Sequence, residues 1–302
     1  MTSPFHPGEQ QIQQRLGVRD KLEAIGQRVI RDHMPEQHRE FFATLPWLLV
    51  GSLDAEGQPH ASVVWGEAGF LHSPHPQRLD INVQPEADDP LAANLRESAS
   101  LGLLGIELPT RRRNRLNGRI TALHMDSFAV AVRESFGNCP KYIQRRHWQH
   151  LPRQPGPLYQ GEGLDTRWLA LALASDTLFI ASRHAQDVDI SHRGGPPGFL
   201  RLGPDGRLWL PDYSGNLMFN TLGNLLLEPR CALLLIDFTN GDLLHLEAKA
   251  ELVWPEHYPQ PAAPGTERQL ALTPGRWRLR KNRLPLTFGP AEPSPYLPVQ
   301  GS

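Results

Sequence analysis

The sequence predicts a mainly β fold with flanking helices, and three observations support this. Short apolar runs such as residues 47–52 and 60–65 are separated by turns rich in Asp and Gly, which is the pattern of β-hairpins. The chain holds 29 Pro and 26 Gly, which suits many short strands and turns better than a helical bundle. The order of these runs also recurs in the second half of the chain.

The two halves align with one another at an almost constant spacing. The matched segments are 66–71 with 195–200 at an offset of 129, and 102–107 with 232–237 and 117–120 with 247–250, both at 130. A constant offset over three separated elements indicates internal duplication of a strand-rich unit. The alternative is the generic rhythm that unrelated β-proteins share.

The expected elements follow from the apolar spacing along the chain. Residues 10–43 have helical periodicity, interrupted at Pro35. Strands are expected at 47–52, 60–65, 79–83, 101–108 and 117–123 in the first half, with a helix at 90–97; and at 178–182, 188–191, 199–202, 208–210, 231–238, 243–253, 276–280 and 284–288 in the second, with a helix at 216–227. Between the halves we expect helices at 125–132 and 164–174, with a loop at 135–142 and a Pro/Gly-rich linker at 151–163.

These elements divide the chain into five parts. We expect a helical segment at 1–43, a first strand-rich half at 44–124, a helical connector at 125–175, a second half at 176–290, and a tail at 291–302 whose last residues look disordered.

Charge and cysteine content exclude several classes of protein. The 302 residues include 31 Lys+Arg and 32 Asp+Glu, a balance that does not indicate a nucleic-acid or membrane surface. There are two cysteines in no CxxC spacing and no HExxH motif, so we expect no metal site. Few cysteines, no signal peptide and no apolar run near ~18 residues favour a cytoplasmic protein.

One local basic run breaks the charge balance. It spans residues 111–115 and contains four arginines. Such a run is either a solvated turn or a patch that recognises an anion or faces a partner subunit.

Two segments of the second half carry polar groups that suit a ligand site. In residues 189–199, a strand end with Ser191, His192 and Arg193 runs into a Gly-Gly-Pro-Pro-Gly turn. Arginine can make a forked contact to phosphate, and glycine lets the backbone approach a ligand closely. The turn has an equally simple interpretation as a rigid connection.

The second segment, residues 210–225, is a strand followed by a Gly-Asn turn and a helix. Exposed N–H groups at a helix start favour anions. Asn216, Asn220 and Asn224 have the spacing of one helix stripe, although asparagine is a poor helix former. A polar ligand on this side explains them, and so does N-capping with a hydrated surface.

These motifs, together with Pro-Arg-Cys-Ala-Leu-Leu-Leu-Ile-Asp-Phe at 229–238 and Phe-Gly-Asn-Cys-Pro-Lys-Tyr-Ile at 136–143, resemble the pyridoxamine 5′-phosphate oxidase-like FMN-binding split-barrel proteins. The resemblance covers about residues 41–286 and is closest to a branch with the second motif. It implies two tandem six-stranded Greek-key barrels, FMN at a barrel–barrel interface, and a homodimer.

Carried over by position, the resemblance places FMN in the second half. The first half has Val63-Val64-Trp65-Gly66 in place of the polar motif, and only Asn94 on its helix, so its flavin motif is lost. The implied cofactor-binding residues are Ser191, His192, Arg193, Gly194, Pro211, Asp212, Tyr213, Gly215, Asn216, Asn220, Thr221 and Asn224, with Lys141 and Tyr142 from the connector.

A cation such as Lys141 beside the flavin N1/O2 edge would stabilise the reduced ring. Cys139 is more simply a neutral thiol than a nucleophile, because reactivity needs a lowered pKa. No catalytic acid or base stands out, and His192 suits hydrogen bonding better.

The implied function is an oxidoreductase that moves hydride or electrons between a reduced donor and a small acceptor or oxygen. NAD(P)H or a separate reductase would supply the electrons. Two alternatives stay open: a non-catalytic flavin- or haem-binding protein, and an electron-transfer module for a reductase.

Overall fold

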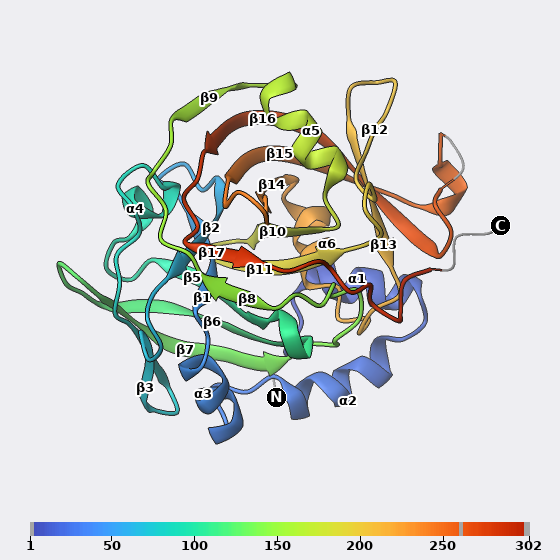
Figure 1. Ribbon diagram of the computed structural model, residues 1–302. Coiled ribbons are helices and arrows are strands. Elements are labelled where there is room, and N and C mark those ends of the chain that lie inside the picture. The colour runs from blue at the N-terminus through green and yellow to red at the C-terminus, as the bar shows by residue number, and fades with distance from the viewer. Residues whose placement is uncertain (1–2, 260–261, 299–302) are drawn as a thin grey trace.

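The computed structural model describes residues 3–259 and 262–298. Three helices open the chain, α1 (Pro7–Arg15), α2 (Arg19–Val29) and α3 (Glu36–Ala43). In Figure 1, α2 and α3 lie along the lower side of the molecule, and α1 lies beside helix α6 (Asn220–Leu227) of the second half. Within the described residues, no helix has the length and apolar character needed to cross a membrane.

The first sheet has seven strands, and one short helix lies between two of them in the sequence. The strands are β1 (Trp47–Leu53), β2 (Pro59–Trp65), β3 (Leu71–His75), β4 (Arg78–Ile81), β5 (Ser100–Glu107), β6 (Arg112–Leu123) and β7 (Phe128–Gly137), in the spatial order β2-β1-β5-β6-β7-β4-β3. Helix α4 (Pro90–Asn94) connects β4 to β5, and a 3₁₀ turn, Leu108–Thr110, precedes β6.

The second sheet repeats this arrangement after helix α5 (Thr166–Ala174). Its strands are β10 (Thr177–His184), β11 (Asp187–Gly194), β12 (Arg201–Leu202), β13 (Leu208–Tyr213), β14 (Arg230–Ile236), β15 (Leu243–Val253) and β16 (Thr266–Arg280), in the order β11-β10-β14-β15-β16-β13-β12. Helix α6 (Asn220–Leu227) takes the place of α4. Strand β9 (Leu158–Glu162) adds to β16, and β8 (Trp148–His150) pairs with β17 (Leu286–Phe288).

The strand registers establish the duplication residue by residue. Leu49 pairs with Val63 and Leu104, and the corresponding Phe179 pairs with His192 and Leu234. The offsets within these pairs are 130, 129 and 130 residues, as the sequence alignment predicts. The fold is therefore mainly β with flanking helices and consists of two copies of one split-barrel topology.

A buried hydrogen bond is also repeated. Asn94 Nδ2 of α4 donates to Ser52 Oγ at 2.9 Å, and Asn224 Nδ2 of α6 donates to Ser182 Oγ at 3.0 Å. Both residues of each pair are buried, so each amide helps to fix its helix against the first strand of its own sheet.

The described residues form four apolar cores. One lies within each half, and a third lies between the two sheets, where Leu49 and Leu104 of the first sheet meet Phe179 and Leu234 of the second. A smaller fourth core joins the N-terminal segment to the rest of the molecule. Side chains alternate across a strand, so Leu48 and Leu49 enter different cores. Burial on both faces explains why β1 and β10 are continuous apolar runs.

The predicted helix at 125–132 is wrong, because residues 128–137 form strand β7. Phe128, Val130 and Val132 have the period of two that a strand needs, and they fill the first core between β6 and β4. The linker at 151–163 contains the unexpected strand β9, and β3 and β8 were also not predicted. Residues 299–302, expected to be disordered, lie outside the described residues.

Candidate functional site between the two halves

A cavity lies where the second sheet meets the start of β6 and the loop after β7. Its volume is about 110 Å³, several times the ~10–15 Å³ that one water needs, and it opens to solvent. The lining residues from the first half and connector are Arg113, Arg115, Asn138, Cys139, Lys141 and Tyr142; those from the second half are Ser191–Gly194, Pro211–Tyr213, Gly215–Leu217, Phe219–Leu222 and Arg268.

Thirteen of the fourteen residues expected at the cofactor line this one cavity. They are Ser191, His192, Arg193, Gly194, Pro211, Asp212, Tyr213, Gly215, Asn216, Asn220, Thr221, Lys141 and Tyr142. The exception is Asn224, whose amide bonds Ser182 instead. Residues far apart in the sequence therefore meet at one place, and their role in binding a cofactor stays a prediction.

The proposed asparagine stripe is wrong in detail. Helix α6 begins at Asn220, so Asn216 lies in the preceding loop, where its Oδ1 accepts a hydrogen bond from the Met218 N–H at 3.1 Å. This loop is held in unusual backbone conformations, since Leu217 has φ 61° and Phe219 has φ 66°. Left-handed backbone at non-glycine residues is uncommon and concentrates at ligand sites.

Three arginines of the cavity were not among the predicted site residues. Arg113 and Arg115 come from the basic run at 111–115, whose patch interpretation the geometry favours, and Arg268 comes from β16. The available signal was the alternation of arginines along β6, which points Arg113 and Arg115 to the same face. Nothing local in the sequence marks Arg268.

Ion pairs hold most of these cations in place. Arg193 and Arg268 both bind Asp212, at 2.7 and 2.8 Å. Arg115 binds Asp189 at 3.0 Å and donates to Ser191 Oγ at 2.5 Å. The cavity wall itself contains five cationic side chains and one carboxylate of the described residues.

Arg113 differs from the other arginines because it has no carboxylate partner among the described residues. It donates to the carbonyl of Cys139 at 2.8 Å and contacts His192 Nδ1 at 3.0 Å. Burial, together with Arg115 and Arg193, lowers the pKa of Arg113 to about 9, so it is still a cation at neutral pH. An anion in the cavity would relieve this repulsion.

His192 is a neutral hydrogen-bonding group. Burial and then the nearby Arg113 and Arg193 place the pKa of His192 well below 6.5. Because Arg113 donates to Nδ1, the ring proton belongs on Nε2, which has no partner in the described part of the chain. His192 therefore offers one unused N–H donor.

The connector loop closes the cavity against the strand end at Gly194. A Cβ at Gly194 would overlap the carbonyl oxygen of Tyr142, so only glycine allows this approach. Tyr142 has φ 65°, donates its hydroxyl to the carbonyl of Ser214 at 2.9 Å, and packs against Tyr213 with 5.2 Å between ring centroids. Lys141 lies beside it with its Nζ 5.9 Å from the Tyr296 ring.

Helix α1 supports the cavity from behind. Glu9 accepts a hydrogen bond from Asn220 Nδ2 at 2.5 Å, while Asn220 Oδ1 accepts from Arg115 at 3.0 Å. Gln13 donates to the carbonyl of Met218 at 3.1 Å. Gly8 and Gly223 bring the two helices into contact, because a Cβ on either would overlap the other helix.

This support is expected to weaken as the pH rises from 6.5 to 8. Burial, with the charges of Glu134 and Asp189 adding to it, raises the pKa of Glu9 to about 8. The folded chain thus keeps a proton that the unfolded chain loses above ~4.5, so stability falls through this window and levels off above 8. His6, whose pKa burial lowers to about 4, acts in the opposite direction only below 6.5.

We expect the free energy of unfolding to fall by at most about 2 kcal/mol between pH 6.5 and 8. Glu9→Gln should remove most of this fall. Urea denaturation of both chains at three pH values in the window measures it, and an unchanged slope in the variant would refute the assignment to Glu9.

The fold and this cavity define the class: a duplicated mainly β protein with a cationic cavity shared by its two halves. Residues 34–151 match a family model described as pyridoxamine 5′-phosphate oxidase. The match lies in the first half and the following loop, and it supports a relationship of this chain to that family.

Solved structures give a weaker likeness. HupZ from Group A Streptococcus is 11% identical, with 34% of this chain and 98% of that chain covered and a TM-score of 0.28. A putative pyridoxamine 5′-phosphate oxidase from Lactobacillus delbrueckii is 14% identical, with 35% of this chain and 95% of that chain covered and a TM-score of 0.28. The conserved hypothetical protein Rv2991 from Mycobacterium tuberculosis is 18% identical, with 40% of this chain and 88% of that chain covered and a TM-score of 0.29. No curated protein matches the chain.

Proposed function

We propose that the protein binds FMN in the cavity between its halves and acts as a flavin-dependent oxidoreductase. The observation that carries the proposal is the convergence of thirteen motif residues on one cavity with an excess of cations. Fold likeness alone would not support a cofactor, because one fold hosts many functions.

The residues present suit FMN chemically. Its phosphate needs cations and forked donors, which Arg113, Arg115 and Arg193 supply. The polar groups of a ribityl chain and a flavin ring need hydrogen-bond partners. His192 Nε2 and Arg193 Nε are buried atoms without a partner in the described residues, so both would be satisfied by a polar ligand.

The bound flavin would supply hydride and electron transfer. The chain would bind and orient it: Asp212 fixes the guanidinium of Arg193, and Tyr142 and Tyr213 give one side of the opening an aromatic wall. Lys141 would place a positive charge near the ring edge, where reduction adds negative charge. The electron acceptor would be a small molecule or oxygen, and the donor NAD(P)H or a reductase.

Both sides of this site come from one polypeptide. Arg113 and Tyr142 belong to the first half and its connector, and Arg193 and Asn216 belong to the second. We therefore propose that cofactor binding does not require a second subunit, although the chain can still form the homodimer that the resemblance implies.

The test is to incubate the purified chain with FMN, remove free flavin and record the visible spectrum. We expect a yellow protein that NADH or NADPH bleaches without oxygen. Arg193→Ala should weaken FMN binding roughly 10–100-fold, because a hydrogen bond to a charged group contributes about 1.5–3 kcal/mol.

Arg28→Ala is the matched control, since Arg28 is exposed and its guanidinium contacts only a backbone carbonyl of its own helix. A colourless chain that does not take up FMN would refute the cofactor. A yellow chain that no donor reduces would refute the oxidoreductase and leave a binding protein.

A further inference from the structure

The duplication implies a second site, related to the first by the same residue offsets. Arg115 on β6 corresponds to His245 on β15, because they pair with the corresponding residues Leu104 and Leu234. Ser191 corresponds to Ser62, since their strands differ by 129 residues; the polar motif of the first half therefore keeps its serine, which the sequence comparison missed.

The counterparts of two further parts of the cavity lining, the segment after β7 and the loop before α6, can be placed in the same way. Arg115 pairs with Phe136, and the corresponding His245 pairs with Arg278. Two residues further along the chain, Asn138 of the cavity, which follows the end of β7, corresponds to Arg280, because Asn138 bonds Arg113 and Arg280 pairs with the corresponding Leu243. The loop before α6, at 216–219, corresponds to the loop at 86–89 before α4, because Asn224 and Asn94 make the same bond.

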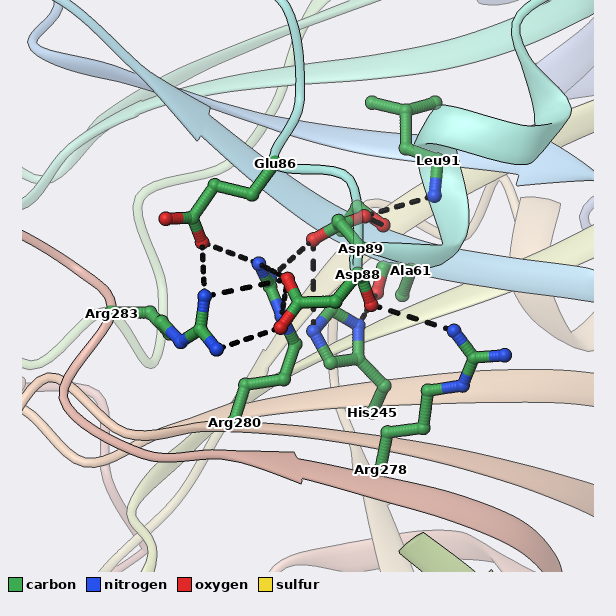
Figure 2. A network of polar contacts seen from close by, with 10 residues as sticks. Ala61, Glu86, Asp88, Asp89, Leu91, His245, Arg278, Arg280 and Arg283 are labelled. Carbon is green, nitrogen blue, oxygen red and sulfur yellow. Dashed lines mark hydrogen bonds and ion pairs between the residues drawn. The ribbon is translucent and has the colours of Figure 1, made fainter. Parts of the chain in front are cut away.

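The chain itself fills this second location. The side chain of Arg280 is 0% exposed and binds three carboxylates at once, namely Glu86, Asp88 at 2.6 Å and Asp89 at 2.7 Å. Arg283 binds the far side of Asp88 at 2.7 Å. Figure 2 shows these carboxylates pointing into the space between Arg280, Arg283 and His245.

The loop at 86–89, with its three acids, occupies the position that corresponds to the open cavity of the second half. Asp89 Oδ1 accepts hydrogen bonds from Ser62 Oγ at 2.5 Å and from the Leu91 N–H at 2.9 Å. Carboxylate and phosphate present the same kind of acceptor oxygens to a guanidinium. The corresponding loop beside the open cavity, residues 216–219, contains no acid. It therefore places no carboxylate on Arg113, which has no carboxylate partner among the described residues and can bind an external anion.

We propose that the Arg280 cluster is a second phosphate-type anion site that the protein occupies with its own carboxylates. Each chain then binds one FMN, and Glu86 and Asp88 keep a second one out. The identity of the excluded ligand rests on the proposed function, but the occupancy of the cluster does not.

The test counts inorganic phosphate bound per chain by equilibrium dialysis of the full-length protein. Glu86→Gln/Asp88→Asn should bind one more phosphate per chain than the wild type, and adding Arg283→Ala should remove that gain. Glu97→Gln/Asp126→Asn neutralises two exposed acids and should leave the count unchanged.

The proposal is overturned if the double variant gains no phosphate, or if the wild type binds two FMN molecules. Should the double variant not fold, Glu86→Gln alone is scored by the same criterion, because its side chain is 31% exposed at the edge of the cluster. The gain of one phosphate is independent of FMN, so a chain that gains it without binding FMN refutes only the proposed function.

Discussion

Replacing Arg280 with methionine is expected to lower the free energy of unfolding by about 3–5 kcal/mol. The guanidinium is completely buried and forms ion pairs with Glu86, Asp88 and Asp89. Without it, Asp89, itself 3% exposed, is left as a buried charge with only neutral donors and a distant histidine. Urea denaturation at pH 7 measures the loss.

Arg278→Met provides the control for this change. Arg278 lies two residues away on the same strand, is exposed, and makes only a 3.4 Å contact to the carbonyl of Asp88. Its replacement should change stability by no more than about 0.5 kcal/mol. Equal losses in the two variants would show that the buried cluster has no special role.

Replacing Gly194 with alanine is expected to cost about 1–3 kcal/mol of stability and to weaken FMN binding. The added methyl group would overlap the carbonyl of Tyr142, and backbone on both sides limits any adjustment. The connector loop would have to move away, and Lys141 and Tyr142 would move with it. Thermal unfolding and FMN titration measure the two effects.

Gly215→Ala separates this crowding from a general intolerance of the site to alanine. The nearest atom to a Cβ at Gly215 is the Tyr213 carbonyl oxygen, at an ordinary 3.9 Å. Gly215→Ala should therefore unfold at the wild-type temperature. If Gly194→Ala is as stable as the wild type, the connector loop does not close on Gly194 as described.

Much of the fold follows from local sequence patterns. Hairpin turns, apolar runs and the constant offset predict the strands and the duplication, because each depends on residues close in the chain. The error at 125–132 has a physical reason: Met125, Ala129 and Ala131 are good helix formers, and the buried face that makes this segment part of a strand is created by β6 and β4.

The candidate site is predictable where motifs are continuous and not where partners come from elsewhere. Ser191–Gly194 form one continuous motif, and the loop before α6 forms another, so each motif can be recognised from the sequence. Arg268 enters through a β13–β16 pairing across 56 residues, and Glu9 reaches Asn220 across 211. The carboxylates that fill the second site become visible only when the registers of the two sheets are compared.

A titration of the full-length chain with FMN, followed by quenching of flavin fluorescence, tests the central claim most directly. We expect saturation at one FMN per chain and much weaker binding by Arg113→Leu, which introduces the residue found at the corresponding position 243. Saturation at two, or the same affinity in the variant, would contradict a single FMN site built around the cations between the two halves.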